Sequence, residues 1–521
     1  MTIVVRETAL PYRDYPPLGP SLLGYDPVLE LPADHLARLV DQIVDQTVVV
    51  ARRKPKPGCV PYDPRLCLKV LVYGYSLGMR SSRQLEEMCR DRLSFKLLTR
   101  GHTPSYHTLC NARNQQKDHL EAIWVGLFKV AEASGIKRCG RIVVDSSKLR
   151  ANAGKDATVK QSEFAPVLAE LERILGEAER VDAAEAECAP VETLLGKTVD
   201  TEQMRDILRR VRTQIRHSKR EGEATDAPPL RTAASKRLTP GMRRRVKQAK
   251  SAIEAAQAEG RKHACVTDPD ARMMMGGSEK KVEQSHSFEA AADNGLLVAG
   301  QSTQVGNDNG RLEELVDAAR GQEPEGVTAV TADSGYYSGD AIARLAESGI
   351  DLCVPDPNTA GDMHRGRPIG TTASKGKEAI SFIYDAKHNC YRCPQGNVLR
   401  YKQKQEHGGQ QMSVFRAERD CTGCPLASVC LKMHYAKRRV LKVGRSQRLL
   451  DGLRQRFSEQ EHKNRYHQRA HAIETVFAYL KQMLGYTRWL LRGAKGVAAE
   501  ASLFKIAYQM RKVHIRWAET Q

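Results

Sequence analysis

The chain has 521 residues, of which 41% are hydrophobic and 28% are charged, and its formal net charge at pH 7 is +20. This length allows two to four domains with a substantial buried core. No apolar run approaches the roughly 20 residues that cross a bilayer, and the N-terminus lacks the basic-then-apolar order of a signal peptide, so a cytoplasmic protein with no membrane partner is predicted. The excess of basic residues favours a polyanionic partner, and nucleic acid is the natural candidate.

The first part of the chain is predicted to be helical. A Pro-rich extended segment precedes one amphipathic helix over residues 31–48, and the pattern from 63 to 135 is helical throughout, with breaks near Gly78 and Gly101. Thr103 and Pro104 are predicted to be the N-cap and first residue of the next helix. Short helices with tight turns are compatible with a helix-turn-helix-like DNA reader, with 103–114 as its recognition helix. A solvated helix face in a bundle is the alternative.

Two apolar β-type runs each end on a carboxylate. RIVVD ends at Asp145 and is followed by Ser-Ser-Lys148, and VTAVTAD ends at Asp333 and is followed by the tight-turn sequence Ser-Gly-Tyr. A helical segment near the C-terminus carries Glu474. An Asp after a strand is often only an N-cap or turn former. Three acids presented in this way nevertheless indicate a two-metal nuclease site, because carboxylates hold the hard cations that activate phosphodiester chemistry.

Between residues 152 and 263 the composition shifts to Ala, Glu, Arg and Lys with heptad-like spacing, which predicts an inserted helical hairpin. The stretch 231–250 holds eight basic residues and no acid, including Arg243, Arg244 and Arg245. This charge is typical of a surface that binds a phosphate backbone, although a flexible solvated charge run is the alternative.

From residue 263 to 360 the chain alternates between β-type and helical patterns. With the Asp145 strand, these segments give five strands, and the alternation predicts one mixed sheet covered by helices. The Asp145 strand is expected to lie beside the Asp333 strand. After Pro357 the chain reads as polar and irregular.

The chain has 13 cysteines, an odd number, which argues against a disulfide framework. Two CxxC pairs about thirty residues apart have the spacing of a structural zinc site, and five cysteines cluster there: Cys390, Cys393, Cys421, Cys424 and Cys430. A closed four-thiolate site would stabilise a small insert and would not take part in catalysis. A set of free thiols is the alternative.

These motifs resemble those of the bacterial insertion-sequence DDE transposases, which have an RNase H-like catalytic core. VDSSKLRANAG is similar to the first-acid motif of that family and ADSGYYS to the second, while Tyr466, Arg469, Glu474 and Lys481 resemble its Y-R-E-K signature around the third acid. The helical segment from 61 to 113 is similar to the N-terminal domain of these enzymes. The family places its Arg four positions before the Glu, whereas Arg469 lies five before Glu474, so His467 and His471 remain alternatives for the basic group.

The resemblance implies that Asp145, Asp333 and Glu474 hold two Mg²⁺ ions, for which Mn²⁺ can substitute, and that the protein cuts the ends of an element and joins their 3′-hydroxyls to target DNA. Double-stranded DNA is then the partner, and synapsis of two ends implies a homodimer. Lys148, Tyr466, Arg469 and Lys481 are expected beside the phosphate, together with the three arginines of the basic stretch. The family's usual zinc ligands correspond to Cys393, Cys421, Cys424 and Cys430, with Cys390 as an alternative.

The predicted fold class is α/β, a five-stranded mixed RNase H-like sheet with an all-α N-terminal domain and two insertions. The expected boundaries are a helical DNA-binding or dimerisation domain (1–135), the first part of the core (136–154), a basic helical insertion (155–262), the continued core (263–360), a cysteine-rich insert (361–450) and the closing helices with the third acid (451–521). Two other functions remain open, an RNase H-like nuclease that does not transpose and a silent DNA-binding descendant of a transposase.

Overall fold

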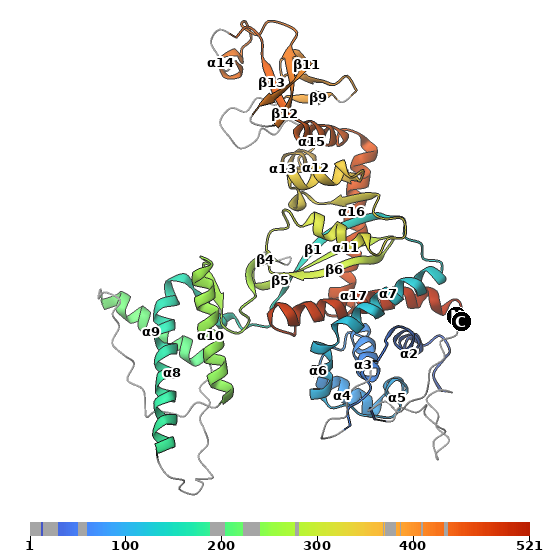
Figure 1. Ribbon diagram of the computed structural model, residues 1–521, viewed down its shortest axis with the longest axis vertical. Coiled ribbons are helices and arrows are strands. Elements are labelled where there is room, and N and C mark those ends of the chain that lie inside the picture. The colour runs from blue at the N-terminus through green and yellow to red at the C-terminus, as the bar shows by residue number, and fades with distance from the viewer. Residues whose placement is uncertain are drawn as a thin grey trace.

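A computed structural model describes residues 12–13, 30–50, 60–187, 204–221, 240–276, 281–367, 369, 382–385, 387–407, 410–431 and 436–521 (Figure 1). The N-terminal part is helical, as predicted. Its helices are α2 (Leu36–Thr47), α3 (Pro64–Ser76), α4 (Ser82–Asp91), α5 (Leu93–Thr99), α6 (Tyr106–Gln115) and α7 (Lys117–Ala133). None of the described helices is long and apolar enough to cross a membrane.

The start of α6 differs from the prediction. Ser105 is the N-cap, and its hydroxyl accepts a hydrogen bond from the Thr108 N–H at 3.3 Å, so Thr103 and Pro104 lie before the helix. Arg113 is buried at 4% exposure and donates to the Arg80 carbonyl and the Ser82 hydroxyl. Because these bonds hold its guanidinium inside the helical domain, Arg113 is not available to read DNA bases.

A mixed sheet forms the centre of the molecule. Its strands are β1 (Arg141–Arg150), β4 (Arg272–Gly276), β5 (Lys281–Asp293), β6 (Leu296–Thr303), β7 (Ala329–Ala332) and β8 (Asp351–Cys353). The order is β4-β5-β1-β7-β8, with β6 also paired to β5. β5 runs antiparallel to its neighbours, whereas β1, β7 and β8 are parallel.

The sheet therefore has six strands and not the predicted five. All five predicted strands are present, and β4 is the addition. It forms because β5 is 13 residues long: Ser287–Asp293 pairs with β6, while Lys281–Ser285 extends beyond β6 and pairs with β4. The β5–β6 hairpin turns at Asn294 and Gly295, both with positive φ, a backbone that Asn-Gly adopts readily.

Helices cover the sheet and join it to the N-terminal domain (Figure 1). They are α11 (Leu312–Arg320), α12 (Gly339–Glu347), α13 (Pro357–His364), α15 (Arg445–Arg456), α16 (Gln460–Ala478) and α17 (Gly493–Ala518). α16 packs against β1 and β7, and α17 packs against β6, α3 and α7. One hydrophobic core runs through these elements, in which Trp489 stacks on Phe504 with ring centroids 4.9 Å apart.

The insertion after β1 has its own core. It contains β2 (Thr158–Lys160), α8 (Phe164–Glu187), α9 (Met204–Glu221), α10 (Pro240–Ala258) and β3 (His263–Cys265). β2 and β3 form a two-stranded sheet at its base. The predicted hairpin is thus three helices on a small ribbon, and they lie beside the sheet as a separate body (Figure 1). The basic residues 231–239 lie outside the described part.

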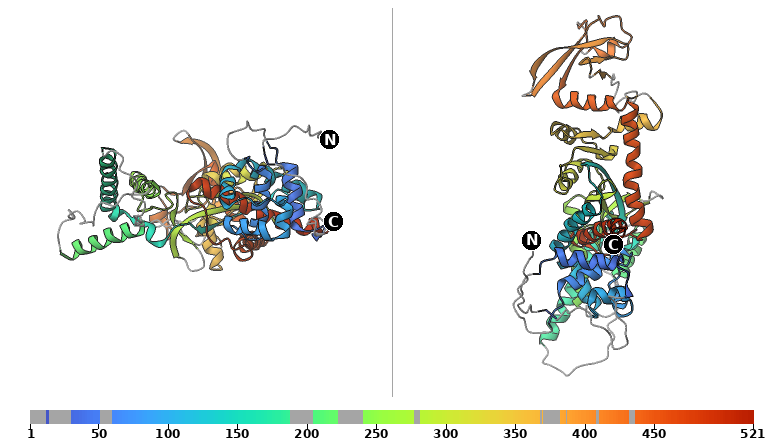
Figure 2. Two further views of the ribbon diagram at one scale, coloured as in Figure 1. Left: turned by 90° about the horizontal axis from the view of Figure 1, so that it is seen from below. Right: turned by 90° about the vertical axis from the view of Figure 1, so that its right-hand side faces the viewer.

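The cysteine-rich segment, predicted to be irregular, contains a five-stranded antiparallel sheet. Its elements are β9 (Ile383–Asp385), β10 (Cys390–Arg392), β11 (Val398–His407), β12 (Gln410–Ala417), the short α14 (Ala427–Cys430) and β13 (Val440–Gly444). A third small core, which includes Tyr391, Leu399 and Phe415, holds the sheet together. The sheet stands at one end of the molecule, beyond α15 (Figure 2).

Candidate active site

Asp145 and Asp333 lie side by side on neighbouring strands. The parallel register of β1 and β7 ends at the pair Val144 and Ala332, and the next residue along each chain is an aspartate. The prediction that the two strands are adjacent is confirmed. The prediction that Asp145 ends its strand is wrong, because β1 continues to Arg150 through its long pairing with β5, so Asp145 lies mid-strand where β1 outruns β7.

The turn after β7 fixes the Asp333 carboxylate. Asp333 is the N-cap of a short 3₁₀ turn (Ser334–Tyr336), and its Oδ1 accepts the Gly335 N–H at 2.5 Å. A Cβ at Gly335 would stand 2.8 Å from Asp333 Oδ1 and 3.6 Å from Asp308 Oδ2. The first distance is shorter than real contacts allow. Glycine therefore leaves a cradle open between two carboxylates at this point.

Asp145 is held by its own strand and by α16. Its Oδ1 accepts the Ser146 N–H at 2.7 Å, and its Oδ2 lies 3.4 Å from Arg469 Nη1. Burial raises the pKa of Asp145 to about 6; the Ser146 N–H and Arg469 oppose this rise, while Asp333 and Asp308 add to it. Two further carboxylates thus repel charge on Asp145, and a cation between them would relieve that repulsion.

Sequence reasoning missed Asp308. It lies in the loop after β6, and its Oδ1 accepts hydrogen bonds from the Ser146 hydroxyl at 2.9 Å and from Lys148 Nζ at 2.7 Å. Burial raises the pKa of the Tyr336 hydroxyl, the nearby Asp308 and Asp145 carboxylates raise it further, and a hydrogen bond with Ser146 opposes the rise. The only sequence signal was the turn-forming run Gly-Asn-Asp-Asn-Gly after a predicted strand.

Of the Y-R-E-K residues on α16, Arg469 reaches the site at the sheet and Glu474 does not. Arg469 reaches Asp145, and its guanidinium lies 5.4 Å from the Tyr466 ring centroid. Ile473 and Val476 are fully buried on the sheet side, whereas Glu474 is exposed. Because α16 is regular from Gln460 to Ala478, Arg469 and Glu474 remain about 140° apart around its axis.

A π-helical turn does occur, at Tyr479–Met483, and it contains Lys481. Lys481 is half-buried; burial lowers its pKa, and Asp145 opposes that shift. Lys481 is thus within electrostatic range of Asp145. Among the described residues, Glu474 has no hydrogen bond or ion pair to either aspartate, and no three His, Cys, Asp or Glu side chains converge into a metal-holding group.

Four of the five clustered cysteines line one pocket of the β9–β13 sheet: Cys393, Cys421, Cys424 and Cys430. The Asn397 N–H donates to Cys393 Sγ at 3.2 Å, and the Leu426 N–H donates to Cys424 Sγ at 3.4 Å. Burial raises the pKa of Cys430, and the other three cysteines raise it further. Cys390 lies buried on β10 and is not part of the pocket lining.

Two regions of the chain match known protein families. Residues 392–514 match a family described as "Transposase DDE domain", and residues 29–115 match one described as "Transposase domain (DUF772)". The chain belongs to the DDE transposases. No curated protein matches it. The DDE-domain match of this transposase includes the four pocket cysteines, Arg469, Glu474, Lys481 and most of α17. Asp145 and Asp333 lie before the matched region.

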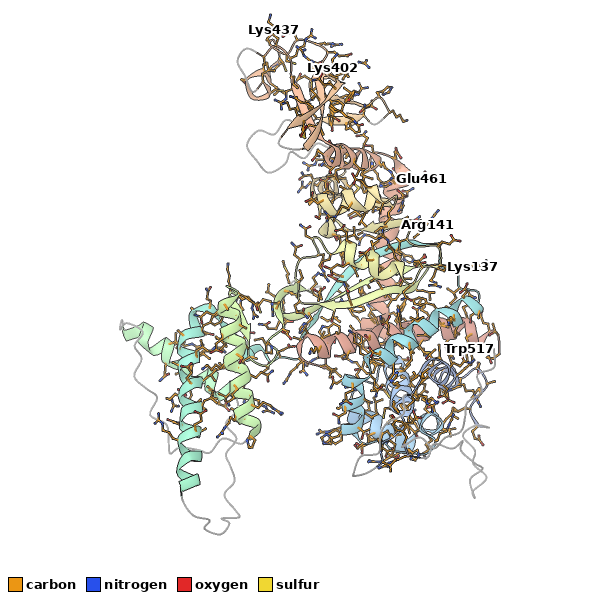
Figure 3. All side chains as sticks on the ribbon, viewed as in Figure 1. Lys137, Arg141, Lys402, Lys437, Glu461 and Trp517 are labelled. Atoms are coloured by element: carbon orange, nitrogen blue, oxygen red, sulfur yellow. The ribbon has the colours of Figure 1, made fainter. Side chains whose placement is uncertain are left out.

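The transposase has basic side chains on both bodies that flank its sheet. On α10, Arg244, Arg245 and Lys247 are exposed and no carboxylate of the described residues pairs with them, whereas Arg243 is half-buried and donates to the Ala178 carbonyl. On the β9–β13 sheet, Lys402 and Lys437 are exposed (Figure 3). Divalent metals are the usual cofactors of DDE transposases, and DNA is the substrate of transposases.

Proposed function

We propose that this transposase binds the ends of an insertion sequence, cuts the DNA there, and joins the freed 3′-hydroxyls to target DNA. The observation that carries the proposal is the adjacency of Asp145 and Asp333 at the end of the β1–β7 register. Asp145 on β1 and Asp333 directly after β7 are held by a rigid sheet, which can place charge more accurately than a loop. The five predicted strands all lie in one mixed sheet, which supports an RNase H-like core with one added strand, β4.

The donor set fits divalent cations. Asp145, Asp333 and Glu474 offer carboxylate oxygens, the ligands that Mg²⁺ and Mn²⁺ prefer, and the Gly335 cradle keeps side chains out of the space beside Asp333. Bound there, the cations would supply Lewis-acid stabilisation of the attacking and leaving oxygens. Glu474 is exposed on α16, which packs against β1 and β7, so its participation requires that its side chain or the helix moves toward the two aspartates.

Basic groups around the acids would bind and orient the phosphate. Lys481 and Arg469 approach from α16 and its π turn, and Lys148 approaches from β1. The Arg469 guanidinium lies over the Tyr466 ring, a cation–π contact that helps to orient it. In the absence of DNA, Arg469 is paired with Asp145, and a phosphate would compete for the same guanidinium.

Replacing Arg469 by alanine should slow DNA cleavage by about 10- to 100-fold at saturating DNA, because a misoriented phosphate costs rate more than affinity. The measurement is the single-turnover cleavage rate of the purified protein. His471→Ala is measured in parallel, since His471 is exposed on the same helix and is an alternative for the basic group. A normal rate for Arg469→Ala with a slow His471→Ala protein would transfer the basic role to His471.

The exposed face of α10 is proposed to bind the phosphate backbone of an element end. Replacing Arg244, Arg245 and Lys247 by glutamine should weaken DNA binding and reduce the slope of log affinity against log salt by about 2 to 3, since each lost phosphate contact removes about 0.9 from it. The salt dependence of duplex binding measures this. The same three-residue change should leave thermal stability unaltered, and an unchanged salt slope would remove α10 from the interface.

A homodimer is proposed to hold the two element ends. The cysteine pocket is proposed to hold a structural Zn²⁺ through Cys393, Cys421, Cys424 and Cys430. The N–H donors to Cys393 and Cys424 support thiolate sulfurs, because such hydrogen bonds stabilise negative charge.

The proposed function is tested by incubating the protein and Mg²⁺ with a supercoiled plasmid that carries the gene and its flanking DNA. Nicks at both flanks support it; binding to the flanks without any nick contradicts it.

A further inference from the structure

Asp308 ties the loop after β6 to the part of β1 that follows Asp145. Its two oxygens lie 2.7 and 3.0 Å from Lys148 Nζ, and its Oδ1 also accepts the Ser146 hydroxyl. Lys148 Nζ lies 2.6 Å from the same hydroxyl oxygen. The Lys148 and Asp308 side chains are only 14% and 19% exposed. A closed triangle of polar groups therefore holds two side chains of β1 at fixed positions.

The stem of Lys148 is confined as well. A Cβ at Gly276 on β4 would stand 2.9 Å from Lys148 Cβ, so the backbone of the added strand packs directly over the lysine. An ammonium group has three N–H donors, and three acceptors lie within reach of Lys148 Nζ: both Asp308 oxygens and the Ser146 hydroxyl oxygen. A phosphate oxygen that binds Lys148 would therefore replace the longer Asp308 contact, at a position that β4 and Asp308 set together.

The same triangle acts on both aspartates. The Ser146 hydroxyl donates to Asp308 and the Ser146 backbone N–H donates to Asp145. Because the side chains of Asp145 and Ser146 point to opposite faces of β1, Ser146 links the Asp145 carboxylate on one face to Asp308 on the other. On the other side, Asp308 Oδ2 borders the cradle at Gly335 that Asp333 also borders. Asp308 is thus connected to Asp145 through one residue and faces Asp333 across one glycine.

We propose that Asp308 is a positioning residue of the transposase site, which fixes Ser146 and Lys148 and through them the Asp145 carboxylate and one phosphate contact. The proposal rests on the proposed function, since it presumes that the Asp145–Asp333 pair is the cutting site. A carboxylate is needed at 308 because its negative charge strengthens the hydrogen bonds from the ammonium and the hydroxyl, and both of its oxygens lie near Lys148 Nζ. An asparagine keeps the shape and loses that charge.

The test compares Asp308→Asn and Lys148→Met with the full-length wild type on the plasmid described above. Both variants should nick it about 10- to 100-fold more slowly at saturating DNA, because small displacements of catalytic groups have effects of this size. Asp308→Asn should bind DNA with the wild-type dissociation constant. The double variant, Asp308→Asn with Lys148→Met, should nick no more than about threefold more slowly than the slower single variant, since the two changes remove one shared interaction. Asp317→Asn is the matched control, an exposed aspartate that is ion-paired with Arg320 at 2.8 Å.

Mn²⁺ binding without DNA, followed by electron paramagnetic resonance, separates positioning from metal ligation. Unchanged Mn²⁺ affinity in Asp308→Asn is expected. Any of three results would overturn the inference. These are a normal nicking rate of Asp308→Asn, losses of rate that multiply in the double variant, and a nicking rate of Asp308→Asn that more Mn²⁺ restores. If Asp308→Asn does not fold, as judged by thermal unfolding, Lys148→Met gives the same test from the other side. A wild type that never nicks DNA would overturn the proposed function itself, whereas a wild type and an Asp308→Asn protein that nick equally would overturn this inference alone.

Discussion

Asp333→Ala protein should nick DNA at least about 1000-fold more slowly than wild type, equivalent to about 4 kcal/mol of activation free energy, while binding DNA as well as before. The reason is that Asp333 is proposed to hold a cation, and no other group of its turn can do so: its neighbours Ser334 and Gly335 offer no carboxylate. Asp145→Ala should behave in the same way. The measurement is single-turnover nicking with Mg²⁺, alongside a binding assay.

Asp340→Ala is the control for this pair, because Asp340 is an exposed aspartate on the next helix, α12. It should nick at the wild-type rate. Glu474→Ala is the more informative member of the series, since Glu474 has no contact with the two aspartates among the described residues. Mg²⁺-dependent nicking retained by purified Glu474→Ala would remove Glu474 from the site, and retention by Asp333→Ala or Asp145→Ala would remove the site altogether.

Cys421→Ser should unfold the β9–β13 sheet. The small core of this sheet has few large side chains, among them Tyr391 and Phe415, and the buried Cys421 lines the pocket beside it. A structural zinc contributes its binding free energy to folding, typically about 10–16 kcal/mol in apparent terms, so its loss should exceed what this core can supply. The expected results are about one zinc per chain in wild type, none in Cys421→Ser, and lost hydrogen-exchange protection in β10–β13 only.

Cys390→Ser makes the same chemical change on a buried cysteine of the same sheet, outside the pocket. It should keep the zinc and the exchange protection. Zinc lost from Cys390→Ser and kept by Cys393→Ser would show that Cys390 is the fourth ligand. Zinc-free wild-type protein with a fully protected sheet would show instead that the pocket is a set of free thiols.

The strand that carries Asp333 could be predicted because its signal is local. A buried apolar run is followed at once by a Ser-Gly-Tyr turn, and β7 does end at Ala332. The extent of β1 could not be predicted, since the residues after Asp145 are polar and become strand only by pairing with β5, more than 130 positions away. Long-range pairing decides such boundaries, and it leaves no mark in the local pattern.

The orientation of Glu474 and the role of Asp308 also depend on packing. α16 was predictable as a helix, but its rotation follows from which side chains fit the sheet, here Ile473 and Val476. Asp308 lies in a polar loop like many others until β1 and β6 are placed together. The β11 and β12 strands were missed because their exposed side chains are polar, and only the antiparallel ladder between them makes them strands.

Strand joining tests the central claim most directly. Labelled duplexes carrying the DNA that flanks the gene would be incubated with the protein, Mg²⁺ and a second, unlabelled duplex, beside the Asp333→Ala protein. The account predicts nicks at both flanks and labelled 3′ ends joined to the second duplex, with neither product from Asp333→Ala. Flanking DNA that is bound but neither cut nor joined in Mg²⁺ or Mn²⁺, or the same products from Asp333→Ala, would contradict it.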